Sequence, residues 1–145
     1  MSVVGSYRRG KEYSGDIDVL IKTPSVKNNS IYNKFIDELV KSGYLVEELS
    51  RGQKKYMGIC KYGDNYRRID IMFTKPDEYP FALLYFTGSK DFNVNMRADL
   101  MSKGMTLNEY SLKDNSTKKK VNHKFVIEKD IFDYIKYEYV EPENR

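Results

Sequence analysis

The sequence predicts an α+β protein of two small lobes, and three observations support this fold class. Apolar and polar residues alternate over residues 16–22 and 66–73, which is typical of strands with one buried face. Apolar residues recur at helical spacing over residues 31–42 and between Ser89 and Gly104. A turn-rich stretch, TKPDEYP, interrupts the pattern at Pro76 and marks a boundary between the two lobes.

In the first lobe, residues 1–76, the segment DIDVLIK predicts a strand with Asp16 and Asp18 on the face opposite its isoleucines. The following helix is expected from about Ile31 to Ser42, with Asn29 or Ser30 as N-cap and Gly43 as C-cap. YLVEEL predicts a strand, and KKYMGICKY and YRRIDIMF predict a hairpin around the turn GDN. In that last strand Asp70 lies on the face opposite Arg67, Ile69, Ile71 and Phe73.

In the second lobe, residues 77–145, EYPFALLYF predicts a short helix that ends at TGS. The helix between Ser89 and Gly104 places Phe92, Met96 and Leu100 on one stripe, with Asn93 and Arg97 on the neighbouring one. MTLNEYSL and KFVI predict short strands around a polar loop, and EKDIFDYI predicts a last helix before the tail VEPENR. The lysine run 118–120 in the polar loop fits either a solvated loop or a contact with a phosphate backbone.

The amino-acid composition excludes several kinds of catalytic and metal-binding site. The 145 residues are 32% charged and 40% hydrophobic, as in globular proteins, and no apolar run approaches the roughly 20 residues of a membrane span. One cysteine, Cys60, excludes an internal disulfide or a multi-cysteine zinc site, and one histidine, His123, leaves little scope for histidine-based catalysis. Carboxylates and basic residues must therefore carry any catalysis. The net charge of +4 fits a polyanionic partner, as it fits many solvated surfaces.

Three acids are the candidate catalytic and metal-binding residues. Asp16 and Asp18 from one strand and Asp70 from another converge if the two strands are neighbours in one sheet. Carboxylates side by side repel unless a cation neutralises them, and hard oxygen ligands suit Mg²⁺. The acids therefore predict a site for two Mg²⁺ ions, for which Mn²⁺ can substitute, that activates a hydroxyl and stabilises a leaving pyrophosphate. The alternative is that the acids are simply exposed at strand ends.

The stretch GSYRRGKEYSG precedes the acids and resembles an anion-binding turn. The backbone N–H groups of Gly5 and Ser6 can approach a phosphate closely, and Arg9 supplies charge and hydrogen bonds. The alternative is a Gly/Ser turn with a solvent-facing arginine pair.

Four segments together, GSYRRGKEYSGDIDVLI, RRIDI, LYFTGSKDFNVNMRADLMSKGMTLNEYSL and EKDIFDYI, closely resemble in order and spacing the catalytic part of the family X DNA polymerases, the polymerase beta type. The resemblance covers almost the whole chain. It implies a nucleotidyltransferase palm with a mixed sheet, followed by a small α+β C-terminal subdomain, the thumb. It further implies templated transfer of a deoxynucleotide to a primer 3′-hydroxyl on primer-template or gapped DNA, within DNA repair.

The resemblance also implies a role for each site residue. Asp16 and Asp18 are similar to ligands of both metal ions, and Asp70 to the ligand of the catalytic ion. The implied nucleotide contacts are Gly5, Ser6, Arg9, Ser14 and Gly15 for the triphosphate, Tyr85, Phe86 and Gly88 for the sugar, and Asn93 for the base. Arg68 is similar to a residue at the primer end, and Arg97 to one that touches the template. A cis peptide bond between Gly88 and Ser89 is implied as well.

Departures from the family leave alternatives open. Four residues precede Gly5, whereas typical relatives carry a lyase domain and a helix-hairpin-helix domain there, so we expect a fragment of a longer polymerase with weak or no activity alone. Met72 stands where polymerase beta has an arginine. A non-catalytic nucleotide- or DNA-binding module and a template-independent nucleotidyltransferase remain alternatives. We expect an intracellular protein, in the nucleus or cytoplasm. The composition, rich in Lys, Asn, Tyr and Ile, is typical of an A·T-rich genome, and if that genome is viral we expect the protein in a viral factory.

Overall fold

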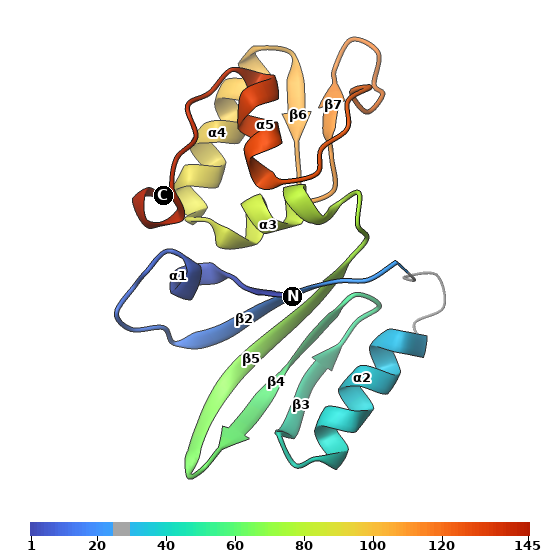
Figure 1. Cartoon of the computed structure of the whole chain (residues 1–145), viewed down its shortest axis with the longest axis vertical. Coiled ribbons are helices and arrows are strands. Elements are labelled where there is room, and N and C mark those ends of the chain that lie inside the picture. The colour runs from blue at the N-terminus through green and yellow to red at the C-terminus, as the bar shows by residue number, and fades with distance from the viewer. Residues whose placement is uncertain (25–29) are drawn as a thin grey trace.

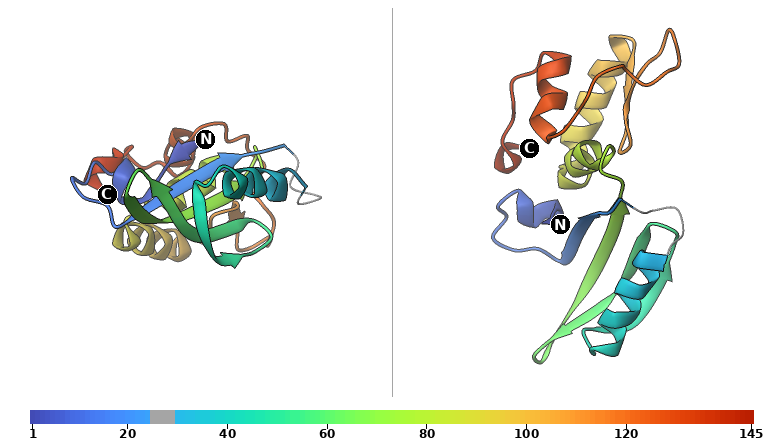
Figure 2. Two further views of the ribbon diagram at one scale, coloured as in Figure 1. Left: turned by 90° about the horizontal axis from the view of Figure 1, so that it is seen from below. Right: turned by 45° about the vertical axis from the view of Figure 1, so that its right-hand side comes forward.

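The structure is a computed structural model that describes residues 1–24 and 30–145. It has two lobes stacked along the long axis, and β5 of the first lobe leads directly to α3 of the second (Figure 1 and Figure 2, right). The elements are β1 (Ser2–Val3), α1 (Gly5–Arg8), β2 (Asp16–Lys22), α2 (Ser30–Lys41), β3 (Leu45–Arg51), β4 (Lys55–Tyr62), β5 (Asn65–Thr74), α3 (Tyr79–Thr87), α4 (Lys90–Ser102), β6 (Met105–Leu107), β7 (Leu112–Asp114), α5 (Glu128–Ile135) and a 3₁₀ turn, η1 (Pro142–Asn144).

A five-stranded sheet of order β1-β2-β5-β4-β3 forms the first lobe. β2 runs parallel to β5, and the other neighbouring pairs are antiparallel, so the sheet is mixed, as the family resemblance implies. The parallel pair requires a long crossover, which α2 and the two strands after it provide. The predicted hairpin is confirmed: Tyr62 pairs with Asn65 around Gly63 and Asp64, and Gly63 adopts a φ of 58°.

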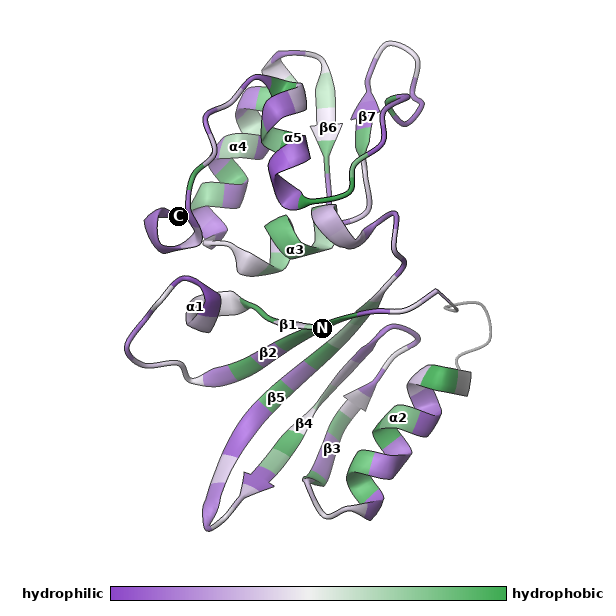
Figure 3. Cartoon of the chain, viewed as in Figure 1, coloured by the Kyte–Doolittle hydropathy of each residue, from purple (hydrophilic) through white to green (hydrophobic). Residues whose placement is uncertain are grey.

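One face of the sheet is covered by α2. Tyr32 and Ile36 of this helix pack against Ile69, Ile71 and Phe73 of β5, as the alternation along β5 predicts. Figure 3 shows the same alternation of hydrophobic and hydrophilic residues along the strands. The helix ends at Lys41, one residue before the expected Ser42, and the predicted C-cap Gly43 follows with a φ of 77°. Of the two predicted N-caps, Asn29 lies outside the described residues, and Ser30 is the first residue of the helix.

The opposite face of the sheet, which carries the acids, is partly covered by a second small core. Leu20 and Met72, on the same strand faces as the acids, are 0% and 4% exposed. They pack with Val4 and with Ala82 of α3 in this core. The acids therefore lie where this apolar cover stops. Met72, which departs from the family pattern, is part of the cover.

The second lobe packs around its own core and shares α3 with the first. Phe81 and Leu84 of α3 join the predicted stripe of α4 and three apolar residues of α5 in one cluster. Ala82, on another side of α3, packs on the sheet. Because α3 is apolar on several sides, it connects the cores of both lobes. Among residues 1–24 and 30–145, no helix has both the length and the apolar character of a membrane span.

Three local predictions were wrong. Residues 124–127 form no strand, because the N–H groups of Val126 and Ile127 donate to Asp130 Oδ2 at 2.7 and 2.9 Å and cap α5 instead. The partner of β6 is β7, and the MTLNEYSL segment turns at Asn108, whose Oδ1 accepts from the N–H groups of Tyr110 and Ser111. The tail VEPENR is folded, and it includes η1.

Candidate active site

The three predicted acids lie together on two neighbouring strands. In the parallel register of β2 and β5, Asp18 is opposite Asp70 and Asp16 is opposite Arg68. Residues that face each other across a pleated pair share a face of the sheet, so the carboxylates gather at one place. Asp70 is 6% exposed, whereas Asp16 is exposed and Asp18 is intermediate. The structure thus brings together acids that are 52 residues apart in the chain, from Asp18 to Asp70.

Basic side chains pair with two of these acids, Asp70 and Asp16. Lys55 Nζ lies 2.8 Å from Asp70 Oδ2, and Arg68 Nε lies 3.2 Å from Asp70 Oδ1 and 3.9 Å from Asp16 Oδ2. Burial, followed by the negative charges of Asp70 and Asp16, raises the pKa of Asp18. The site therefore favours additional positive charge near Asp18 even with both basic residues present.

The side chains of Asp16, Asp18 and Asp70 have the right chemistry to bind a hard divalent cation, because all three are carboxylates. Both oxygens of Asp70 are paired with basic side chains, so an ion bound there would have to replace Lys55 or Arg68. Across the described parts of the chain, no group of three or more His, Cys, Asp or Glu side chains is arranged to hold a metal ion. A metal ion can therefore bind Asp70 only if it displaces the charged group of Lys55 or Arg68 from the carboxylate.

The Gly/Ser stretch before β2 folds back onto the acids. Gly5 opens the one-turn helix α1 with a φ of 64°, and a Cβ at this position would overlap Asp18 Oδ2. Only glycine meets both requirements. Ser6 Oγ and Ser14 Oγ are 2.8 Å apart, and this contact joins the two ends of the loop. The predicted phosphate contacts on either side of the loop, Ser6 and Ser14, are thus side by side.

Arg9 points from this loop to the end of α3. Its Nη1 donates to the carbonyl oxygen of Thr87 at 2.6 Å, next to Gly88. Arg9 Nε is buried and has no partner among the described residues. Gly88 has a φ of 68°, and its peptide bond to Ser89 is cis, as the resemblance implies. Arg9 thus connects the loop to the end of α3.

The predicted residues of the second lobe form one contact group. Asn93 Nδ2 donates to the carbonyl oxygen of Tyr85 at 2.8 Å, and the Arg97 guanidinium stacks over the Tyr85 ring at 4.6 Å. The Tyr85 and Phe86 rings meet edge to face, with centroids 4.9 Å apart. Arg97 also lies 3.7 Å from Glu109. The α3–α4 junction therefore holds these side chains in a fixed arrangement.

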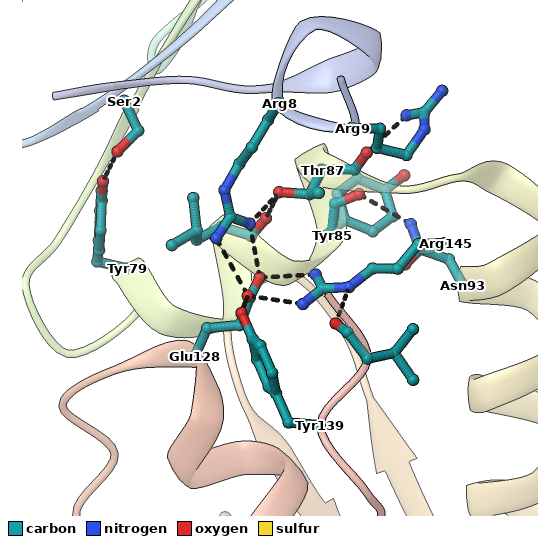
Figure 4. A network of polar contacts seen from close by, with 12 residues as sticks. Ser2, Arg8, Arg9, Tyr79, Tyr85, Thr87, Asn93, Glu128, Tyr139 and Arg145 are labelled. Atoms are coloured by element: carbon teal, nitrogen blue, oxygen red, sulfur yellow. Dashed lines mark hydrogen bonds and ion pairs between the residues drawn. The ribbon is translucent and has the colours of Figure 1, made fainter. Parts of the chain in front are cut away.

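Sequence reasoning missed a buried charge cluster that connects the two lobes (Figure 4). Glu128 of α5 accepts from Arg8 of α1 at 2.9 and 3.2 Å and from Arg145 at 2.9 and 2.8 Å. The Tyr139 hydroxyl donates to Glu128 at 3.0 Å, and Arg8 also donates to Thr87 Oγ1. Burial alone would raise the pKa of Glu128, but the hydrogen bonds from Arg145 and Arg8 outweigh it and hold that pKa below its ordinary value.

Two signals in the sequence pointed toward this cluster: Glu128 at the start of the last helix, and Arg8 directly before Arg9. Neither signal specifies a partner. Arg145 also stacks against the rings of Phe92, Phe132 and Tyr139 at 5.3 to 5.5 Å. Its side chain is 0% exposed. The cluster holds α1, and with it the loop of Ser6 and Arg9, against the second lobe.

The site thus consists of a mixed sheet that carries three carboxylates beside a Gly/Ser loop, joined to a small second lobe through an apolar helix. The family model of the DNA polymerase beta palm matches residues 1–76, and that of the DNA polymerase beta thumb matches residues 82–145. The chain belongs to the family X DNA polymerases.

Three relatives illustrate the similarity. DNA polymerase lambda of Rattus norvegicus is 39% identical over 158 residues, and that of Arabidopsis thaliana is 30% identical over 162 residues. Both alignments cover 97% of this chain, but only 28% and 31% of those relatives, so the chain spans about three tenths of their length. Repair DNA polymerase X of African swine fever virus is 28% identical over 142 residues, which cover 98% of this chain and 79% of that protein.

Proposed function

We propose that this chain is the catalytic core of a repair DNA polymerase, which adds a deoxynucleotide to a primer 3′-hydroxyl opposite a template base. Its substrates are deoxynucleoside triphosphates and primer-template or gapped DNA inside the cell. Residues 1–76 serve as palm and 77–145 as thumb. The observation that carries the proposal is the register of β2 and β5, which gathers Asp16, Asp18 and Asp70 beside the loop joined by Ser6 and Ser14.

The acids would hold two Mg²⁺ ions, or Mn²⁺ in their place, with Asp16 and Asp18 as shared ligands and Asp70 as the ligand on the primer side. Such ions, when bound, lower the pKa of an attacking hydroxyl and stabilise charge on the leaving pyrophosphate. Before that, Asp70 must release Lys55 or Arg68. Both side chains are about two-fifths exposed, so they can turn to the phosphates of a primer, where Arg68 is assigned.

The remaining residues bind and orient the substrate in this proposal. Gly5, Ser6, Arg9, Ser14 and Gly15 receive the triphosphate. Around the nucleoside, Tyr85, Phe86 and Gly88 pack on the sugar, Asn93 reads the minor-groove edge of the base, and Arg97 touches the template strand. Their mutual contacts, including that between Asn93 and Tyr85, support a preformed pocket wall.

A second candidate is a module that binds nucleotide or DNA without catalysis. The ion pairs of Asp70 favour it, because a carboxylate held by two basic side chains is less available to a metal ion. A third candidate is a nucleotidyltransferase that adds nucleotides without a template, and the primer-extension experiment below tests it as well.

Primer extension on gapped DNA in Mg²⁺, with and without a templating base in the gap, tests the proposal. We expect weak extension that requires the template, and a rate at least 100-fold lower in Asp70→Asn, because a metal ligand is removed. Asp64→Asn is the matched control, since Asp64 is exposed in the β4–β5 turn. Wild-type rates in Asp70→Asn would contradict the assignment of the acids. No extension by the unmodified chain, with nucleotide still bound, would favour the second candidate.

A further inference from the structure

A cavity of about 550 Å³ lies at the junction of the two lobes and contains none of the residues assigned above. It is bordered by the end of β2, the β5–α3 connection, α3, the start of β7 and the segment 120–126 that leads to α5. These segments can be followed in Figure 1. Its volume falls in the range of sites that bind small molecules. The proposed function gives this cavity no role.

The cavity wall combines positive charge with flat rings. Lys22, Lys120 and Lys124 line it, and Asp77 is the one acid among the described residues of its wall. Its aromatic side chains are Phe81, Tyr110, His123 and Phe125, and the Phe125 ring meets those of Phe81 and His123 edge to face at 4.9 and 4.8 Å. Lysines that neutralise phosphate beside rings on which a base can stack are the elements of a nucleotide site.

Ser111 adds an unpaired polar group to the wall. This residue is 4% exposed, and its Oγ has no hydrogen-bond partner in the described part of the chain. Its backbone groups are satisfied by Asn108, so only the hydroxyl lacks a partner. Buried polar groups are nearly always hydrogen-bonded in native proteins, and an unpaired one in a cavity wall favours a ligand with polar atoms.

Tyr110 connects the cavity to the acids. It also borders a second groove, of about 170 Å³, whose wall includes Lys54, Lys55 and Met72. The Lys54 ammonium lies 5.2 Å from the Tyr110 ring, and Lys55 contacts Asp70. Lysines therefore follow one another from Asp70 past Tyr110 into the cavity, although Lys54 lies 4.0 Å from Glu78 Oε2 and Glu109 also borders the groove. A free nucleotide has no need of such a track of lysines, whereas a polynucleotide strand does.

We propose that the cavity binds an unpaired nucleotide of a single-stranded DNA segment that passes the acids along this track. The identification of the polymer as DNA rests on the proposed function. The lysines contact the backbone phosphate, and the rings of Phe125 and Tyr110 take the base.

Fluorescence anisotropy with a labelled eight-residue thymidine oligonucleotide, over a range of salt concentrations, tests the proposal. In the double variant Lys120→Glu/Lys124→Glu we expect at least tenfold weaker binding and a salt slope smaller by roughly 1.4, from two lost phosphate contacts on a single strand. Lys118→Glu/Lys119→Glu makes the same charge change in the same loop outside the cavity and should alter affinity less than about twofold. Equal losses in both variants would overturn the proposal, because they would show a diffuse charge effect.

Two further arms identify the ligand and its position. An oligonucleotide containing 5-iododeoxyuridine should photo-cross-link to Tyr110 or Phe125, and cross-links found only elsewhere would overturn the assignment. Thymidine monophosphate should compete far more weakly than the oligonucleotide, and equal competition would show a free-nucleotide site instead. The readout needs no catalysis, so its outcome is distinguishable from that of the primer-extension test of the proposed function.

Discussion

Two buried carboxylates in this chain, Asp70 and Glu128, are each held by two basic side chains, yet the partners differ in burial. Asp70 is 6% exposed and Glu128 is 4% exposed. The partners of Asp70, Lys55 and Arg68, are 44% and 41% exposed, whereas the partners of Glu128, Arg8 and Arg145, are 22% and 0% exposed. The basic partners are therefore accessible to solvent at Asp70, whereas at Glu128 they are largely buried.

This is the difference we expect between the proposed catalytic site and a structural ion-pair cluster. Water can solvate Lys55 and Arg68 when they leave Asp70, so exchange for another cation costs little. Arg145 cannot be solvated without opening the lobe, so loss of its partner leaves an uncompensated buried charge. Burial of the partners, rather than of the carboxylate itself, distinguishes the two roles.

The largest expected effect is on stability, at Glu128. Glu128→Gln should lower the free energy of unfolding by about 3 kcal/mol, because it leaves two arginines without a counter-charge at a buried position. Urea denaturation measures this. Asp133→Asn is the control, since Asp133 pairs with Lys129 on the surface and should change the free energy by less than about 0.5 kcal/mol. A loss below about 1 kcal/mol in Glu128→Gln would show that both carboxylates are exchangeable and remove the distinction.

A smaller effect is expected at Asp70 on adding metal. Mg²⁺ with a deoxynucleoside triphosphate, at about ten times the dissociation constant, should stabilise the folded chain by about 1.4 kcal/mol, because it binds only that state. For a chain of this size this corresponds to a rise in Tm of about 3 to 6 °C. Thermal denaturation of Asp70→Asn should show a reduced rise, and that of Asp64→Asn an unchanged one. An identical rise in Tm in both variants would show that Asp70 is not a ligand of the metal ion.

The smallest effect expected is a pH dependence at Glu128. Since the pKa of Glu128 is lowered in the folded state, the unfolded chain binds this proton more readily. The stability contributed by the charged group is therefore present above the ordinary pKa of glutamate and is lost as pH falls through the lower, folded value. The stability gap between wild type and Glu128→Gln should narrow over this acidic range. A gap that stays constant with pH would contradict the lowered pKa.

The periodic parts of the fold could be predicted from the sequence, because local pattern determines them. The helix α5 begins and ends where EKDIFDYI predicts, and β2 and β5 carry their acids on the expected face. The residues 124–127 have a strand-like composition, but Asp130 takes the N–H groups that a ladder would need. A competing hydrogen bond from three or four residues away is not visible in a propensity pattern.

The acidic residues of the candidate site could be predicted from the sequence, but the basic side chains that pair with them could not. Asp16, Asp18 and Asp70 follow from alternation and family resemblance, whereas the pairing of Lys55 with Asp70 depends on the antiparallel register of β4 on β5. Arg145 was equally invisible, because the sequence around it is that of a polar tail. Contacts set by tertiary packing between distant segments cannot be read from spacing along the chain.

The register of β2 on β5 determines where this chain can accept insertions. A residue added within β5 before Asp70 would move that carboxylate to the face covered by α2, because side chains alternate along a strand. A residue added at Gly63 or Asp64 would lengthen a solvent-exposed turn and leave the pairing of Asp18 with Asp70 intact. The hairpin tip is thus the place to insert a tag or a reporter peptide, and the strand a few residues further on is the place to avoid.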